Sequence, residues 1–142
     1  MPTFAGRCHC GNLETTLQTE ATAAALPLRS CACTFCRRHG SRTTADARGS
    51  ATINAKDEAL LSRYRFGLGL AEMIVCARCG CYAGAVMEHE GKFVSALNVN
   101  LFADPAFAGR AGDSVSYDGE TAEARRARRL KLWTPTTWVG SK

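Results

Sequence analysis

The sequence lacks the apolar segments that place a chain in a membrane or export it. None of its apolar runs approaches the roughly 20 residues needed to span a bilayer. The stretch from Met1 to Arg7 has neither the basic region nor the apolar region of a signal peptide. We therefore expect a cytoplasmic protein without a membrane partner, in a compartment where cysteines stay reduced.

The sequence also contains no internal repeat and no segment with the composition of a linker. A length of 142 residues is close to the commonest size of a single domain. We therefore expect one domain over residues 1–142, which excludes repeat architectures and a second folded unit.

The strong positive charge expected of a nucleic-acid-binding protein is largely absent. The formal net charge is +5, but seven metal-bound thiolates and two zinc ions would reduce it to about +2. A basic run from Arg125 to Lys131 is the one feature that favours an acidic protein or nucleic-acid partner. Glu120 and Glu123 dilute this run, and it has no interleaved aromatic residues for base stacking. We interpret it as one solvated face of a short helix.

Several short segments alternate between apolar and polar residues, which is typical of half-buried strands. The sequence from Glu120 to Leu132 is rich in helix-forming Ala, Arg and Leu and predicts one C-terminal helix. The region from Leu101 to Ser114 is expected to be loop, and the tail from Trp133 to Lys142, with Pro135, to be loose. The expected strands are Leu13–Thr19, Ala51–Asn54, Leu60–Phe66, Met73–Cys76, Tyr82–Glu88, Lys92–Val99 and Val115–Tyr117, with a hairpin turn at His89-Glu90-Gly91.

The eight cysteines occur in three tight groups, and disulfides are the default explanation only in secreted chains. Metal ligation accounts better for closely spaced cysteines in a reducing compartment. The groups are Cys8-His9-Cys10-Gly11, Cys31-Ala32-Cys33-Thr34-Phe35-Cys36 and Cys76-Ala77-Arg78-Cys79-Gly80-Cys81.

The first and third groups have the form of a structural zinc site. A C-x-x-C turn places two sulfurs on one ion, and a following glycine lets the backbone pass them. Cys76 and Cys79 have this form, with Gly80 next, and need two further ligands. Cys8 and Cys10 are the natural complement. A zinc ion bound by these four cysteines would link the start of the chain to its middle.

The middle group can hold a second zinc through Cys31, Cys33 and Cys36. Three protein ligands leave one tetrahedral position for water or substrate, which is the usual catalytic arrangement. His39 or Cys81 could instead close this site. We interpret His39 as a surface side chain before a turn, and Cys81 as a small buried hydrophobic residue.

With these residues assembled, the chain resembles the family of glutathione-dependent formaldehyde-activating enzymes and centromere protein V. The resemblance covers about residues 4–119, which leaves residues 120–142 as a C-terminal helix and tail. Its marks are Gly6-Arg7-Cys8-His9-Cys10-Gly11, Cys31-Ala32-Cys33-Thr34-Phe35-Cys36-Arg37-Arg38, Tyr64-Arg65-Phe66-Gly67, Cys76-Ala77-Arg78-Cys79-Gly80, Leu97-Asn98-Val99-Asn100 and Tyr117-Asp118-Gly119.

The resemblance implies a mainly β fold, a small zinc-stapled β-tent of short antiparallel sheets with little helix. It assigns Cys8, Cys10, Cys76 and Cys79 to a structural zinc, and Cys31, Cys33 and Cys36 to a second, catalytic zinc. The family's activity is that of a carbon–sulfur lyase, which joins glutathione and formaldehyde into S-hydroxymethylglutathione and reverses that reaction.

The sequence therefore predicts a zinc-dependent carbon–sulfur lyase that acts on a glutathione or small-thiol adduct of an aldehyde. Arg37 and Arg38 follow the third ligand of the second site and could pair with substrate carboxylates. Asn98 and Asn100 could orient substrate, but capping of a turn is the commoner use of such residues. The alternative is a non-catalytic zinc module that binds a protein or nucleic-acid partner.

Overall fold

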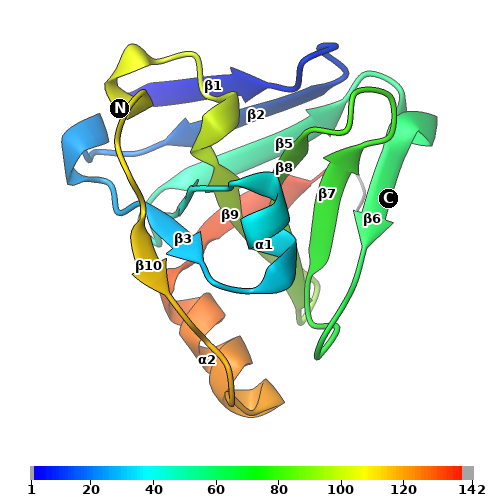
Figure 1. Cartoon of the computed structure of the whole chain (residues 1–142), viewed down its shortest axis with the longest axis vertical. Helices are drawn as coiled ribbons and strands as arrows, with labels where there is room; N and C mark the ends of the chain where they lie inside the picture. The colour runs from blue at the N-terminus through cyan, green and yellow to red at the C-terminus, as the bar shows by residue number, and fades with distance from the viewer. Residues whose placement is uncertain (1, 139–142) are drawn as a thin grey trace.

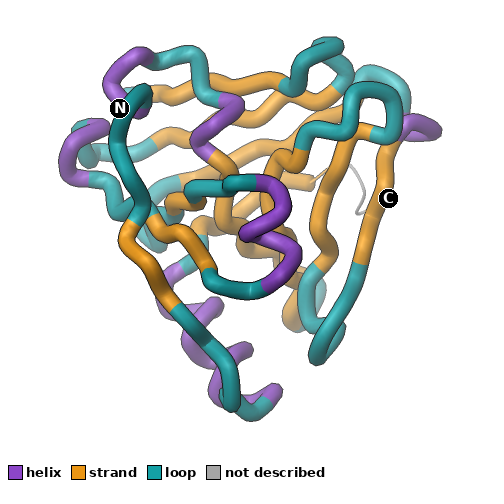
Figure 2. The backbone as a smooth tube through the Cα atoms, in the orientation of Figure 1, coloured by secondary structure: helices purple, strands orange, loops and turns teal. Residues whose placement is uncertain are grey.

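The computed structural model describes residues 2–138, and β-strand is the main regular secondary structure in it (Figure 2). The strands are β1 (Thr3–Arg7), β2 (Leu13–Gln18), β3 (Arg29–Cys31), β4 (Thr43–Thr44), β5 (Ser50–Ala55), β6 (Leu61–Tyr64), β7 (Glu72–Cys76), β8 (Tyr82–His89), β9 (Lys92–Asn98), β10 (Asp113–Val115) and β11 (Thr134–Trp138). The α-helices are α1 (Thr34–His39) and α2 (Ala122–Leu132), and short 3-10 turns are η1 (Ala23–Ala25), η2 (Glu58–Leu60), η3 (Val99–Leu101) and η4 (Pro105–Phe107). The mainly β class predicted from the sequence is confirmed.

Strand β9 is the point at which the sheet divides into branches (Figure 1). One edge of β9 pairs with β8, which continues to β7 and β6. The other edge is shared: Phe93–Ser95 pair with β11, and Leu97 and Asn98 pair with β4. From β11 the sheet runs on to β5, β2 and β1, and from β4 it runs to β3 and β10. The strands thus form one connected but branched sheet, mostly antiparallel, with two parallel pairs.

The predicted hairpin between β8 and β9 is present, with His89 paired to Lys92 across a turn at Glu90 and Gly91. Both turn residues have positive φ, 52° and 78°, which is the geometry of a tight turn that matches the twist of the strands. Strand β2 alternates buried and exposed residues as its sequence pattern predicted.

The C-terminal tail is a correction to the sequence-based expectation. Thr134–Trp138 form β11, which lies inside the sheet between β5 and β9, whereas a loose tail was expected. Trp133 and Trp138 are both buried and anchor the two ends of this segment. Pro135 is tolerated because the ladder to β5 begins only at Thr136, so the proline faces a single strand partner. Residues 139–142 of the expected tail lie outside the described residues.

The region expected to be loop between Leu101 and Ser114 is also more ordered than predicted. It contains η4 and the start of β10, which spans Asp113–Val115 where Val115–Tyr117 was expected. Phe107 is buried and contacts the ring of Phe4 edge-on, at 5.3 Å between centroids. This packing explains the order, because burying an aromatic ring stabilises the turn that carries it.

Helix α2 lies at one end of the molecule, beside the branch formed by β3 and β10 (Figure 1). Thr121 caps its N-terminus by accepting a hydrogen bond from the amide of Ala124. The helix then passes into β11 through Trp133 alone. Within residues 2–138, no helix is long and apolar enough to cross a membrane.

Candidate functional site

The structure brings together the four cysteines of the first and third sequence groups. Their sulfur atoms lie within 4.8 Å of one another, at the end of β1 and at the turn that follows β7. The Sγ atoms of Cys8 and Cys10 are 3.7 Å apart, and those of Cys10 and Cys76 are 3.5 Å apart. Four thiolates around one tetrahedral ion have edges of this length, about 3.8 Å for zinc. The cluster therefore fits a closed four-thiolate metal site.

Local backbone turns hold each of these two cysteine pairs. Gly11 and Gly80 adopt φ of 84° and 81°, a conformation that residues with a Cβ rarely adopt, as the glycine after each pair predicted. The amides of Leu13 and Cys79 donate to the sulfurs of Cys8 and Cys76 at 3.2 and 3.5 Å. Such amide donors orient thiolates and stabilise their charge.

The second cluster consists of Cys31, Cys33 and Cys36, whose sulfurs also lie within 4.8 Å of one another. Cys31 ends β3, Cys33 caps α1, and Cys36 lies in the first turn of α1. The Cys33 sulfur accepts the amide of Cys36 at 3.4 Å. Among residues 2–138, no fourth His, Cys, Asp or Glu joins this cluster.

Two thiols of the second cluster, those of Cys31 and Cys36, shift each other's pKa in opposite directions. A hydrogen bond from Cys36 lowers the pKa of Cys31 to about 5, and the pKa of Cys36 is raised because it donates to Cys31. The positive charge of Arg128 also lowers the pKa of Cys31. A lowered thiol pKa favours metal binding, because metal ligation requires deprotonated sulfur.

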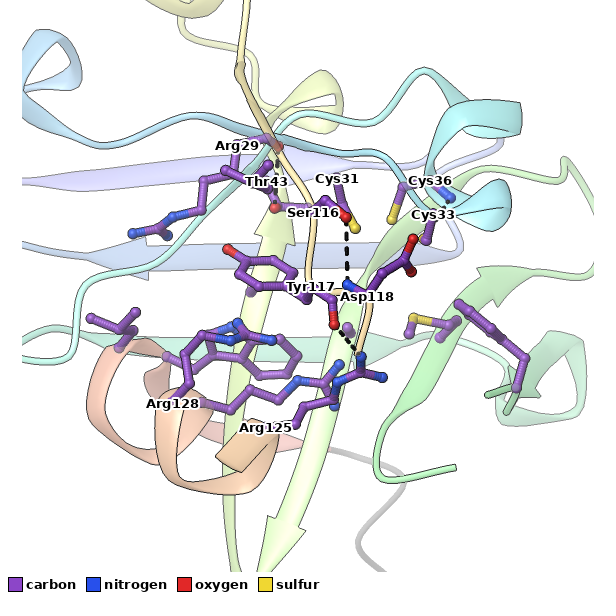
Figure 3. Close-up of a pocket in the computed structure, with 18 of the residues that line it drawn as sticks. Arg29, Cys31, Cys33, Cys36, Thr43, Ser116, Tyr117, Asp118, Arg125 and Arg128 are labelled. Carbon is purple, nitrogen blue, oxygen red and sulfur yellow. Dashed lines mark hydrogen bonds between the residues drawn. The ribbon is translucent and has the colours of Figure 1, made fainter. Parts of the chain in front are cut away.

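The second cluster borders a cavity of about 110 Å³ (Figure 3). Arg29 and Cys31 both line it because alternate residues of a strand face the same side, and Val115, paired with Cys31, lines it from β10. The floor is apolar and comes from β7, β8 and β9. The residues of the floor are Met73, Tyr82, Ala85 and Ala96, and Phe66 and Trp133 complete the apolar wall.

One face of helix α2, mostly basic, forms a wall of the cavity. The residues of this face have the spacing i, i+3, i+4, i+7 of one helix face and are Arg125, Arg128, Arg129 and Leu132. In Figure 3, Arg125 and Arg128 lie on the far side of Tyr117 from the cysteines. The expectation that the basic run forms a solvated face is therefore wrong for these three arginines, since they are partly buried against the cavity.

The carboxylate of Glu120 forms hydrogen bonds with two of these arginines. It accepts hydrogen bonds from Arg125 at 3.1 Å and from Arg128 at 2.9 and 3.0 Å. These bonds, led by that of Arg128, lower the pKa of Glu120 to about 2. The Arg128 guanidinium also lies 3.5 Å from the ring centre of Tyr117, a cation–π contact. Sequence reasoning missed this network, although the i+3, i+4 spacing of the arginines was visible.

Arg37 and Arg38 lie elsewhere. Both are exposed on α1 and neither lines the arginine-walled cavity. Arg37 borders a second hollow, which Cys31 and Cys36 also line. Arg38 donates to the carbonyl of Thr34 within its own helix. Their contact with a substrate carboxylate stays a prediction.

The remaining candidates are packing and capping groups. His39 is exposed and its ring lies 4.5 Å from that of Phe35. Cys81 is half-buried against the core, outside both clusters. Asn98 caps η3 by accepting the amide of Asn100, which in turn donates to the carbonyl of Gly40.

The fold and the two clusters define a mainly β protein whose cysteines fit a zinc-binding fold. The chain is similar to the crystal structure of a Rhodobacter sphaeroides protein solved as a structural genomics target. The two share 26% sequence identity with a TM-score of 0.57, over 78% of this chain and 99% of the other. No protein-family model and no curated protein matches the sequence.

Proposed function

We propose that the chain is a zinc-dependent carbon–sulfur lyase that acts on the adduct of glutathione, or another small thiol, with an aldehyde. The observation that carries the proposal is the three-cysteine cluster at the edge of an arginine-lined cavity. The resemblance of the cysteine order and spacing to the glutathione-dependent formaldehyde-activating family supports the same chemistry and membership of that family.

We assign zinc to both clusters because an all-thiolate donor set with sulfurs this close suits a tetrahedral, soft-ligand ion. Cys8, Cys10, Cys76 and Cys79 would hold the structural ion, and Cys31, Cys33 and Cys36 the second one. A zinc bound by three thiolates supplies one open position at which a substrate thiol is deprotonated. Three thiolates also donate charge strongly, which favours thiol exchange over activation of water.

In the cleavage direction, the adduct's hydroxyl loses its proton and its oxygen forms the carbonyl. The carbon–sulfur bond breaks, and its electron pair leaves on sulfur. Asp118 is the carboxylate that lines the cavity, and Figure 3 shows it between the cysteines and Arg125. We assign it the role of accepting the hydroxyl proton. The apolar floor formed by Met73 and Tyr82 keeps water from one side of the reacting carbon.

The alternative, a non-catalytic module that binds a partner, has less support, because arginines of the basic run that favoured it form contacts within the molecule. Arg125 and Arg128 are engaged by Glu120, so they offer little to an external acidic partner. Nothing in the described residues gives this alternative a specific observation of its own.

The experiment is a calorimetric titration of glutathione into the zinc-loaded protein and into Cys33→Ser, followed by a lyase assay with S-hydroxymethylglutathione. We expect binding and turnover in the wild type and loss of both in Cys33→Ser. Cys81→Ser is the matched control, since Cys81 lies outside both clusters. Glutathione binding that is absent, or equal in wild type and Cys33→Ser, contradicts the proposal.

A further inference from the structure

Arg129 places a positive charge in the cavity wall without a counter-ion among residues 2–138. Its Nε is buried and has no hydrogen-bond partner there, and no carboxylate lies within 4.0 Å of its guanidinium. The guanidinium lies 4.6 Å from the ring centre of Trp133. A buried polar nitrogen is normally hydrogen-bonded, so the unpartnered Nε of this half-buried guanidinium in a cavity wall points to a missing partner.

Arg129 remains charged although its surroundings oppose the charge. Burial, together with the charges of Arg128 and Arg125, lowers the pKa of Arg129 to about 10. At neutral pH the guanidinium is therefore still a cation, and an anion beside it would relieve both the burial and the repulsion.

Of the three α2 arginines that line the cavity, Arg129 is the one without a carboxylate partner among the described residues. Arg125 and Arg128 already share the carboxylate of Glu120.

We propose that Arg129 binds a carboxylate of the substrate while the substrate's sulfur reaches the three-cysteine cluster. The proposal rests on the proposed function and specifies its substrate class as small thiols, and their aldehyde adducts, that carry a carboxylate. A guanidinium is suited to this task because its fork of donors matches the two oxygens of a carboxylate.

The test compares two thiols that share an S–C–C–O chain but differ in charge, mercaptoacetate and mercaptoethanol, by calorimetry on the zinc-loaded protein. We expect mercaptoacetate to bind about tenfold more tightly, as a charged hydrogen bond predicts. Arg129→Gln should reduce this preference to about twofold or less, and Arg129→Lys should keep part of it. Arg126→Gln is the control, because Arg126 lies on the same helix but does not line the cavity; it should keep the full preference.

Three results would overturn the inference: equal binding of the two thiols to the wild type, an unchanged preference in Arg129→Gln, or loss of the second metal in Arg129→Gln. The last would mean that Arg129 serves the metal and not the substrate.

Failure of the proposed function gives a different result. In that case the Cys33→Ser substitution does not reduce the binding of either thiol. In that case acetate is the probe, with the fluorescence of the nearby Trp133 as readout. An acetate-induced change that Arg129→Gln removes supports the carboxylate site, and the absence of any change contradicts it.

Discussion

The two cysteine clusters use the same kind of ligand but join very different lengths of chain. The four-cysteine cluster connects Cys10 to Cys76, residues 66 positions apart, whereas the three-cysteine cluster lies between Cys31 and Cys36. A metal that closes a long loop removes more entropy from the unfolded chain than one that closes a short loop. If both clusters bind metal, we therefore expect the first to stabilise the fold and the second to add little stability.

The largest effect should follow from removing a ligand of the four-cysteine cluster. Structural zinc contributes about 10–16 kcal/mol to the folding of small metal-binding peptides, and a whole domain is stable by only about 5–15 kcal/mol. We expect Cys76→Ser to unfold or aggregate, as measured by circular dichroism and metal content after purification without chelator. Cys81→Ser should stay folded with two zinc ions. A folded Cys76→Ser protein with both metals would remove the structural role of this cluster.

Removing a ligand of the three-cysteine cluster should have a smaller and different effect. Cys33→Ser should lower the metal content from two zinc ions to one per chain and leave the protein folded. Serine is a good helix cap, so the start of α1, which Cys33 caps, is preserved and the variant isolates the metal. We expect the free energy of unfolding to fall by no more than about 1 kcal/mol. Loss of folding equal to that in Cys76→Ser would show that both clusters are structural.

The smallest effect should come from loosening α2 against the cavity. Glu120→Gln removes the carboxylate that holds Arg125 and Arg128, and we expect a loss of about 1 kcal/mol at neutral pH, seen as a lower melting temperature. The folded pKa of Glu120 is depressed to about 2, so its contribution is present above its unfolded pKa, about 4.3, and disappears as the pH falls through about 2. Glu123→Gln, at an exposed site on the same helix, should leave the melting temperature unchanged.

Spacing within short segments was sufficient to predict how the cysteines group. A C-x-x-C followed by glycine predicts two ligands at one ion whatever surrounds it, and the structure brings Cys76 and Cys79 to Cys8 and Cys10. Zinc itself, the openness of the second site and the lyase activity stay predictions.

The burial of the C-terminal strand and the orientation of α2 could not be predicted from residue spacing in this way. Strand β11 was missed because its sequence is polar and contains Pro135, although Trp133 before it and Trp138 at its end are both buried. The arginine stripe of α2 has the spacing of an inward helix face but not its apolar character. Which face turns inward is decided by Tyr117, Glu120 and Trp133, whose contacts with the arginines the sequence does not reveal.

A crystal structure of the zinc-loaded protein with mercaptoacetate tests the difference between a closed and an open cluster most directly. Anomalous scattering at the zinc edge should show two ions. One should be surrounded by the sulfurs of Cys8, Cys10, Cys76 and Cys79. The other should be bound by Cys31, Cys33 and Cys36, with the thiol sulfur in the fourth position at about 2.3 Å. A single zinc peak, or a second zinc whose fourth ligand is His39 or Cys81, would contradict the account.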